Sequence, residues 1–146
     1  MKKIIVALVV MIVSINTTIA QEWLTDINVA KKNATKESKP IILVFQGSDW
    51  CAPCIKLDRE IWSTETFKKY AKENYVLLKA DFPKRKKNKL SEEQTKSNAL
   101  LAEKYNKQGF FPFVVVLDSN GKVLGESSYK KTTPLNYIKE LNTFTK

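Results

Sequence analysis

The chain reads Asp49-Trp50-Cys51-Ala52-Pro53-Cys54 directly after an apolar run at residues 41–45. This segment holds both cysteines of the protein, with two residues between them. A buried strand that ends near Gln46, with a helix that begins at residue 52 or 53, places Cys51 at a helix N-terminus. Unpaired backbone N–H groups and the helix dipole stabilise a thiolate there. The spacing therefore predicts a redox-active dithiol with Cys51 as the nucleophile.

Pro53 and Cys54 fit the same interpretation. Pro53 suits the first helical turn, because the N–H that it lacks has no intrahelical partner there and its fixed φ favours a helix start. Cys54, one turn into the helix, can reach back to Cys51. Thiol–disulfide exchange passes through a mixed disulfide, which a second thiol held this close can resolve. We predict that Cys51 attacks and that Cys54 resolves.

Other uses of a cysteine pair fit the sequence poorly. A structural zinc site needs four ligands, usually Cys or His, and the chain has no histidine and no third cysteine. Attachment of c-type haem requires a histidine directly after the second cysteine, where this chain has Ile55. An inert structural bridge is the remaining alternative, although so short a loop constrains the unfolded chain little. We expect no metal or other cofactor, and the lack of histidine disfavours hydrolase chemistry.

The first 20 residues have the features of a secretory signal. Residues 1–3 form a basic start, residues 4–13 are apolar, and residues 18–20, Thr-Ile-Ala, offer small residues for cleavage. The apolar core is shorter than the ~20 residues of a spanning helix, which disfavours an uncleaved anchor. We expect cleavage before Gln21 and no stable membrane insertion afterwards. The mature part, residues 21–146, is predicted to be one domain in a periplasm or outside the cell.

The chain is basic, with 25 Lys and Arg residues against 15 Asp and Glu residues and a formal net charge of +10. Much of the excess lies at residues 84–89, Lys-Arg-Lys-Lys-Asn-Lys, which we call the basic loop. A solvated loop is the favoured interpretation, and a patch for acidic partners is the alternative. Nucleic-acid sites usually interleave aromatic residues, which this run lacks, so we expect no nucleic-acid partner.

Apolar spacing and turn residues predict the elements of the first half. Residues 22–36 have the period of an amphipathic helix. Residues 41–45 are apolar on both alternating faces, as expected of a strand covered on each side. Helices are predicted at residues 53–62 and 64–73, before a strand at residues 75–81. A strand, a helical crossover and a second strand indicate a parallel pair with a right-handed connection.

The second half has clear start and turn signals. Ser91 opens a Ser-Glu-Glu-Gln capping box for a helix that is predicted to end near Asn106, before Gly109. Strands at residues 113–117 and 122–125 flank Asn120-Gly121, which predicts an antiparallel hairpin. Thr133-Pro134 begins the last helix, whose expected inward residues are Leu135, Ile138 and Leu141.

Residues 50–54, the Phe111-Pro112 step and the Asn120-Gly121 hairpin follow one another in an order that resembles the thioredoxin superfamily. The resemblance is to exported thioredoxin-like proteins with a Trp-Cys-x-x-Cys active site, and it covers nearly all of residues 22–142. It implies an α/β thioredoxin fold, with a central mixed β-sheet flanked by helices and the dithiol at a strand end. It also implies a cis peptide bond before Pro112, which sets the Phe111 backbone beside the disulfide. The residues alone equally allow a trans proline at the start of an edge strand.

Aromatic residues around these motifs have two interpretations each. The family pattern implies that Trp50 shields the dithiol and offers an apolar surface to partners, while core packing is the alternative. Trp23 and Trp62 are expected in the core. At least one aromatic residue of the cluster near Pro112 is expected to face the partner groove, and its members are Phe110, Phe111 and Phe113.

The chain departs from the thioredoxin pattern at Phe45, where the family commonly has a buried aspartate that helps to move the proton of the second cysteine. Lys79, which aligns roughly with the family's buried lysine, then lacks its usual partner. Glu60 and Lys79 are candidate supporting residues, and Asp49 and Asp58 are further candidates for proton handling. Solvated helix charge is the alternative role for these carboxylates.

Ala52-Pro53 supplies no charge between the cysteines, whereas oxidising relatives typically have a histidine there that favours the reduced form. The pair therefore resembles that of reducing thioredoxins. We expect a monomeric protein-disulfide reductase or isomerase whose partners are proteins with disulfides or thiols, and a membrane thiol-reductase as electron donor. The alternatives are a dedicated thiol reductase of cytochrome c maturation and a non-catalytic thioredoxin-like binding or chaperone module.

Overall fold

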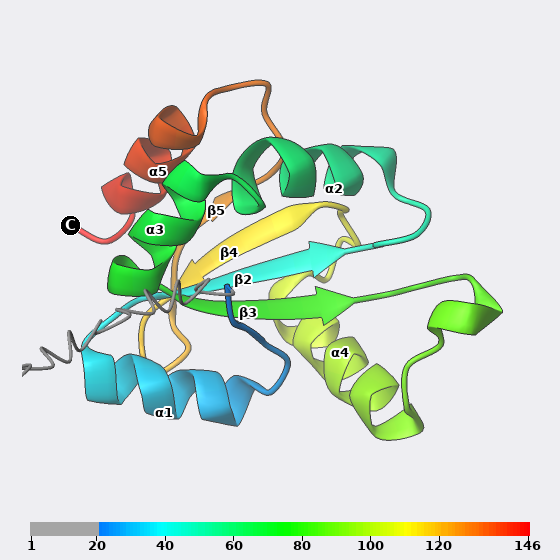
Figure 1. The fold of residues 1–146 in the computed structure, drawn as a ribbon. Coiled ribbons are helices and arrows are strands. Elements are labelled where there is room, and N and C mark those ends of the chain that lie inside the picture. The colour runs from blue at the N-terminus through cyan, green and yellow to red at the C-terminus, as the bar shows by residue number, and fades with distance from the viewer. Residues whose placement is uncertain (1–20) are drawn as a thin grey trace, which may run out of the picture.

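A five-stranded mixed sheet with helices on both faces forms the protein (Figure 1). The structure is a computed structural model that describes residues 21–146, so the predicted secretory signal lies outside the described residues. The strands lie in the order β1-β3-β2-β4-β5. Their bounds are β1 Trp23–Leu24, β2 Ile41–Gln46, β3 Val76–Asp81, β4 Phe113–Leu117 and β5 Val123–Ser127. This architecture confirms the predicted α/β fold with a central mixed sheet.

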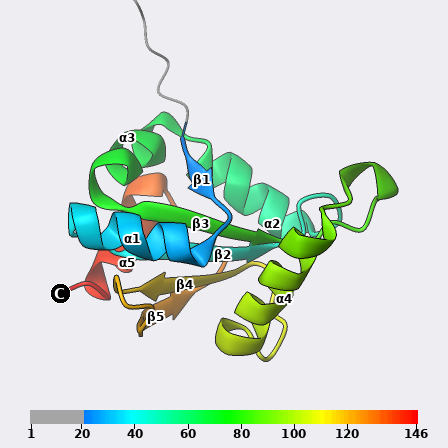
Figure 2. The same cartoon turned by 90° about the horizontal axis from the view of Figure 1, so that it is seen from below.

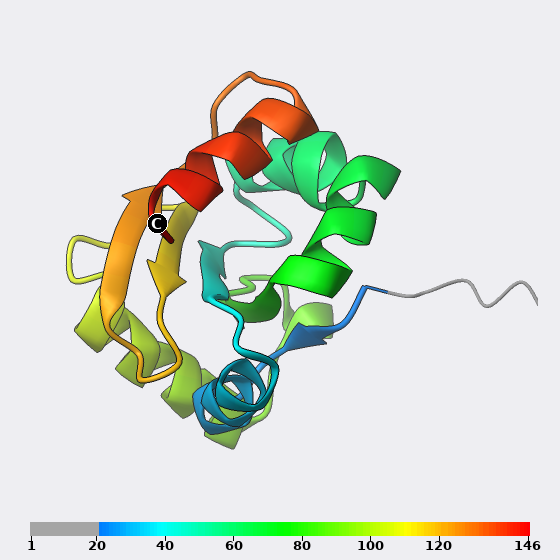
Figure 3. The same cartoon turned by 90° about the vertical axis from the view of Figure 1, so that its left-hand side faces the viewer.

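The helices divide between the two faces of the sheet. Helices α2, α3 and α5 cover one face, and α1 and α4 cover the other (Figure 2), so that Figure 3 shows three layers. A π-helical segment continues α2, and a short 3-10 turn lies within the basic loop. The bounds are α1 Ile27–Glu37, α2 Ala52–Leu57, π-helix Asp58–Trp62, α3 Glu65–Asn74, 3-10 turn Lys86–Asn88, α4 Glu92–Tyr105 and α5 Pro134–Thr143.

The strand pairing brings three chain segments to one edge of the sheet. Strands β2 and β3 are parallel, with Gln46 opposite Asp81, so both end at the same edge. Strand β4 is antiparallel to β2, with Phe45 opposite Phe113, and therefore begins where β2 ends. The segments after residue 46, after residue 81 and before residue 113 meet there as a result.

Side-chain caps explain where several helices begin. Thr64 and Thr133 accept hydrogen bonds from the backbone N–H groups of Phe67 and Asn136, so one of the otherwise unpaired donors at the start of α3 and one at the start of α5 are satisfied. Ser91 caps α4 by accepting from the N–H of Gln94. The Gln94 side chain bonds elsewhere, to the Thr25 carbonyl oxygen and to Asn98, so the capping box is not reciprocal.

The predicted helix at residues 22–36 is wrong in its first part. Trp23 and Leu24 form β1 and pair with Leu77 and Leu78 of β3. The helix begins only at Ile27, because Asp26 has an extended backbone and its side chain caps the N–H of Asn28. Long-range pairing thus overrides the helical spacing at these positions.

Two further expectations about helices need correction. Leu135 is 58% exposed, whereas Tyr137 is fully buried together with Ile138 and Leu141, so the inward face of α5 is shifted from the predicted one. The predicted helix at residues 53–62 is not uniform, because its last turn is π-helical. That segment still buries Trp62 in the core, as expected.

The core has two parts, one on each face of the sheet. The cluster under α2, α3 and α5 is built around Trp62, Phe67 and Tyr137. The cluster under α1 and α4 is built around Phe45, Leu78 and Leu117. Alternating side chains of β2 pack in the two clusters, which explains why this strand is apolar at every position except its last. No helix of residues 21–146 has the length and apolar character to cross a membrane.

Candidate active site

Cys51 and Cys54 form a disulfide at the start of α2. The S–S distance is 2.13 Å and the two Cα atoms are 5.2 Å apart. Each cysteine is only 4% exposed. Cys51 has an extended backbone and is the N-cap of the helix, as the sequence predicted, while Pro53 occupies its first turn. The site therefore presents a nearly buried disulfide whose sulfurs lie at a helix start.

A backbone donor of the first turn points at the first sulfur. Sγ of Cys51 accepts a hydrogen bond from the N–H of Cys54 at 3.3 Å. The carbonyl oxygen of Cys51 accepts the N–H of Ile55 at 3.1 Å and so begins the helical bonding pattern. A donor aimed at sulfur stabilises negative charge there, as does the positive end of the helix dipole. The geometry can therefore support a thiolate at Cys51 once the disulfide is reduced.

Trp50 lies beside the dithiol in a fixed orientation. Its indole N–H donates to the carbonyl oxygen of Phe82 at 2.7 Å. Its ring meets that of Phe111 edge to face, with centroids 5.5 Å apart. A Cβ atom on Gly47 would overlap the indole, so the missing side chain of Gly47 makes room for it. Trp50 remains 39% exposed and offers an apolar surface next to Cys51.

Asp49 holds the start of the basic loop against the active site. Its carboxylate accepts the backbone N–H groups of Lys84 and Arg85 at 2.9 and 3.0 Å and the side-chain amide of Asn88 at 2.9 Å. The bond from the Lys84 N–H, followed by that from Asn88, holds the pKa of Asp49 below its ordinary value. Lys84 also places its Nζ atom 3.9 Å from the Trp50 ring centroid. These contacts give the carboxylate a structural role.

The Phe111–Pro112 peptide bond is cis and lies directly before β4. Hydroxyl Oγ of Ser128 donates to the Pro112 carbonyl oxygen at 2.7 Å, and the Asn106 side chain bonds both the N–H and the carbonyl oxygen of Phe110. Phe111 lies before the first residue of β4, and neither its backbone N–H nor its carbonyl oxygen has a hydrogen-bond partner among residues 21–146. Hydrogen bonds thus hold Phe110 and Pro112 in place, while Phe111, beside Trp50, keeps unpaired backbone groups.

The aromatic residues around Pro112 are not equivalent. Phe110 is 53% exposed, whereas Phe111 is half-buried between the rings of Trp50 and Phe82, each with its centroid 5.5 Å away. Phe113 is half-buried and stacks on Phe45 at 6.4 Å. Phe110 is therefore the member of the cluster that is exposed to solvent.

The buried aspartate–lysine pair of the family has no counterpart at Phe45 and Lys79. Phe45 is fully buried in the core under α1 and α4. Lys79 lies opposite Val44 of β2, and strand alternation sends the two neighbours Phe45 and Val44 to opposite faces. Lys79 makes no salt bridge within residues 21–146. The structure gives it no visible link to the dithiol.

Glu60 lies in the π-helical segment and is bound to another side chain. Its carboxylate accepts the hydroxyl of Tyr129 at 2.8 Å and lies 3.6 Å from Arg59. The Glu60 hydrogen bond raises the pKa of the Tyr129 phenol. Asp58 is exposed and has no side-chain hydrogen bond within the described residues. Among the described residues, neither carboxylate forms a hydrogen bond with a cysteine.

Sequence reasoning missed Gly47, Phe82 and Lys84 as neighbours of the dithiol. The signal was present in the predicted parallel pairing of β2 and β3. Parallel neighbours end at the same edge of a sheet, so the residues after Gln46 and after Asp81 must lie close together. This argument would have placed the basic loop beside Trp50.

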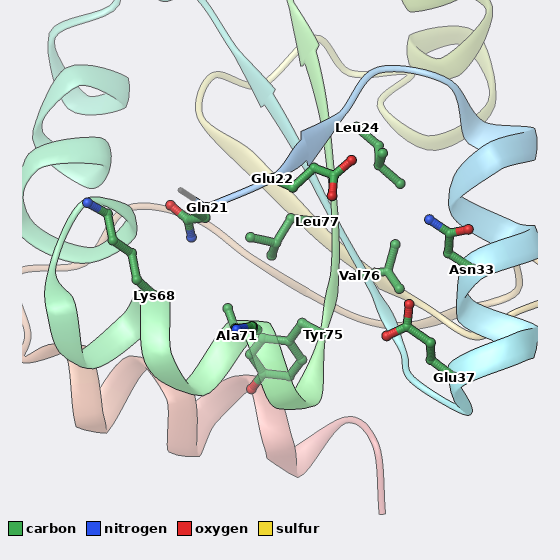
Figure 4. A pocket seen from close by; sticks show the side chains of 11 residues that line it. Gln21, Glu22, Leu24, Asn33, Glu37, Lys68, Ala71, Tyr75, Val76 and Leu77 are labelled. Atoms are coloured by element: carbon green, nitrogen blue, oxygen red, sulfur yellow. The ribbon is translucent and has the colours of Figure 1, made fainter. Parts of the chain in front are cut away.

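A separate cavity of about 260 Å³ lies at the opposite edge of the sheet (Figure 4). Its lining comes from the start of β3, including Val76 and Leu77, and from the ends of α1 and α3, including Glu37 and Tyr75. It contains no cysteine. The cavity is therefore not part of the dithiol site. Residues 21–146 also contain no cluster of three potential metal ligands.

Comparison with known families decides the classification. The pattern of a family described as thioredoxin-like matches residues 22–119. The chain belongs to this family. With the Cys51–Cys54 disulfide, membership places it among the thiol:disulfide oxidoreductases.

Individual relatives agree with this thioredoxin-like classification. A protein of Chlamydia pneumoniae named disulfide bond reductase DsbH is 33% identical over 114 residues, which cover 78% of this chain and 67% of the relative. A solved structure of a DsbH oxidoreductase has 32% identity and a TM-score of 0.73, and the match covers 79% of this chain and 78% of that one. A disulphide isomerase from Xylella fastidiosa Temecula1 shares the fold, with a TM-score of 0.61, 21% identity and coverage of 82% and 88%.

Proposed function

We propose that the protein is an exported thiol:disulfide oxidoreductase that reduces or isomerises disulfides of other proteins. The observation that carries the proposal is the Cys51–Cys54 disulfide at the first turn of α2, with the Phe111-Pro112 segment at the same sheet edge. The name of the Chlamydia pneumoniae relative, a disulfide bond reductase, supports reduction as the direction.

The reaction begins with the reduced protein. The Cys51 thiolate attacks one sulfur of a client disulfide, an S–S bond forms between protein and client, and the second client sulfur leaves and takes up a proton. Cys54 then gives up its thiol proton and attacks Sγ of Cys51. This step breaks the mixed disulfide and releases the other client thiol. Two electrons pass to the client, and the protein is left with the Cys51–Cys54 disulfide.

Phe111 provides a way to hold the client during this exchange. Its backbone N–H and carbonyl have no hydrogen-bond partner among residues 21–146. An extended client segment can pair with such groups as an added strand, which gives affinity without a demand for particular side chains. Trp50 and Phe110 add exposed apolar surface on the same edge. The arrangement suits clients of varied sequence.

The direction of electron flow follows from the residues between the cysteines. Ala52 and Pro53 carry no charge that would stabilise the reduced form as a histidine does in oxidising relatives. We therefore infer a reductant, which in an oxidising compartment needs electrons from a membrane thiol-reductase. Export rests on the sequence of residues 1–20, and the mature protein is inferred to be a periplasmic or secreted monomer.

Equilibration of the mature protein with defined thiol buffers tests the direction. A reduction potential near the roughly −270 mV of thioredoxin supports a reductant, whereas a value near about −120 mV indicates an oxidase. Insulin reduction with dithiothreitol tests the activity itself. The double variant Cys51→Ser with Cys54→Ser should lose all activity. A wild type that accelerates insulin reduction no more than this variant does would indicate a non-catalytic binding module and contradict the proposal.

A further inference from the structure

The basic loop is anchored directly beside the dithiol. Asp49 binds the backbone at Lys84 and Arg85, and the Lys84 ammonium lies over the Trp50 ring, next to Cys51 in the chain. These contacts fix the entry of the loop at the sheet edge where the proposed client binds. The loop is thus part of the surroundings of the active site and not a remote solvated segment.

The positive charge of the loop is not neutralised within the described part of the chain. Five of its six residues are Lys or Arg. None of them takes part in a salt bridge of residues 21–146. The neighbouring carboxylates bind other donors, since Asp49 holds backbone N–H groups and Asp81 accepts both the N–H and the hydroxyl of Ser48. The loop therefore presents an excess of cations to solvent.

A cavity of about 290 Å³ lies within this charged segment. Apolar residues Phe82, Pro83 and Leu90 line it together with cations of the basic loop, and Asp81 and Thr95 complete its lining. Phe82 also contacts the ring of Phe111 and accepts the indole N–H of Trp50. The cavity thus shares a residue with the surroundings of the dithiol. Its lining suits a segment that carries both acidic and apolar side chains.

We propose that the basic loop is a docking surface for an acidic segment of the client polypeptide, close to the cysteine that Cys51 attacks. The inference rests on the proposed function, because a client in mixed disulfide with Cys51 must lie at this edge. An extended chain advances about 3.3 Å per residue, so client residues a few positions from that cysteine reach the loop. Opposite charges at the two surfaces accelerate their encounter and select among clients.

The test compares two cystine peptides of equal length that differ only in their flanks, one with Asp, Glu and Leu and one with Asn, Gln and Leu. At low ionic strength, we expect kcat/KM of the wild type to be about tenfold higher for the acidic peptide, as electrostatic steering produces. Salt should reduce this preference, because the Debye length falls to about 10 Å at 0.1 M. Equal values for both peptides would overturn the inference.

Matched variants separate the loop from total charge. The triple variant Lys86→Gln, Lys87→Gln, Lys89→Gln spares Lys84, which touches Trp50, and should lose most of the preference while it reduces the neutral peptide as before. The control triple variant removes the same number of exposed charges from α1 and α5 and should keep the preference; it consists of Lys32→Gln, Lys36→Gln and Lys139→Gln. A loop variant that retains the preference contradicts the inference.

A binding measurement distinguishes this inference from the proposed function. Fluorescence polarisation with a labelled acidic peptide whose thiols are alkylated reports docking without any thiol exchange. Weaker binding to the loop variant than to the control supports the docking surface, even if the wild type reduces neither peptide and the proposed function fails. Equal binding to both variants, or binding only to vesicles of anionic lipid, overturns it.

Discussion

The indole N–H of Trp50 donates a 2.7 Å hydrogen bond to the carbonyl oxygen of Phe82, the first residue after β3. The bond ties the residue before Cys51 to the end of a neighbouring strand. Because Gln46 and Asp81 lie opposite each other in a parallel pair, the segments that follow them leave the sheet side by side. The position of Trp50 beside the dithiol thus depends on the strand ends as well as on α2.

Gly47→Ala should displace Trp50. The added Cβ would overlap the indole ring, which is held by the bond to Phe82 and has Phe111 at its edge. Overpacking of this kind costs about 1–3 kcal/mol. We expect that loss in the unfolding free energy of the oxidised protein, measured by urea titration, together with a changed tryptophan emission spectrum.

The same substitution in a Trp50→Ala background is the control for this steric argument. With the indole removed, Gly47→Ala should cost little, so the two substitutions should show a coupling energy of about 0.5–3 kcal/mol. Additive effects in the double variant would mean that the cost of Gly47→Ala arises in the backbone and not at Trp50.

Asp49 should control the order of the basic loop in acid. Hydrogen bonds, first from the Lys84 N–H, hold its pKa below the ordinary 3.8. An acid with a lowered pKa in the folded protein stabilises the fold above its ordinary pKa, and the contribution is lost as the pH falls through the lowered value. We expect the amide NMR signals of Lys84 and Arg85 to move together below about pH 4.

Asp49→Asn should remove this acid transition of the loop. The variant should also expose the loop to trypsin at neutral pH, because an amide has only one oxygen to accept the backbone donors. Asp58→Asn removes the same charge from an exposed position with no side-chain bond within residues 21–146 and should change neither result. Equal trypsin cleavage of the two variants would show that Asp49 does not hold the loop.

Parts of the fold that depend on local chemistry were predicted well from the sequence. The apolar run at residues 41–45 became a strand buried on both faces, since its side chains alternate between the two cores. The Asn120-Gly121 turn and the Thr133 cap need only neighbouring residues, and both are present. In the candidate site, the position of the cysteine pair at a helix start followed from the same kind of signal.

Features that depend on distant residues escaped prediction. Strand β1 contains only Trp23 and Leu24, and so short a segment has no periodic pattern. It is recognised only by its pairing with β3. The basic loop is exposed, as expected, but its attachment to the active site was missed because its partner, Asp49, precedes Lys84 by 35 positions. Leu135 was wrongly expected to face inward and the buried Tyr137 was missed, because helical spacing alone does not specify which face meets the sheet.

Glu60→Gln should alter Tyr129 but not thiol exchange. The Glu60 carboxylate raises the pKa of the Tyr129 phenol because it accepts a hydrogen bond from the phenol O–H. The contribution of that pair to stability is present below the ordinary phenol pKa and is lost as the pH rises through the raised value. Without the carboxylate, the Tyr129 pKa should fall toward 10, measured from its ring NMR signals, while the insulin reduction rate stays unchanged.

Tyr129→Phe is the matched control, because it removes the hydrogen bond and keeps the Glu60 carboxylate. Tyr129→Phe should lower the unfolding free energy, and Glu60→Gln should lower it less, because the amide oxygen of Gln can still accept the phenol in a weaker hydrogen bond. A fall of tenfold or more in the exchange rate of Glu60→Gln, with normal exchange in Tyr129→Phe, would instead assign Glu60 to proton transfer at the dithiol.

Cys54→Ser should trap clients on Cys51. The variant keeps the nucleophilic sulfur of Cys51 at the N-cap of α2 but lacks the Cys54 thiol that resolves the mixed disulfide. Non-reducing gels of cell envelopes should show client adducts that dithiothreitol releases, and Cys51→Ser should show none, because the N-cap position and the backbone donor aimed at sulfur belong to Cys51 and not to Cys54. Adducts in Cys51→Ser and none in Cys54→Ser would reverse the roles of the two cysteines.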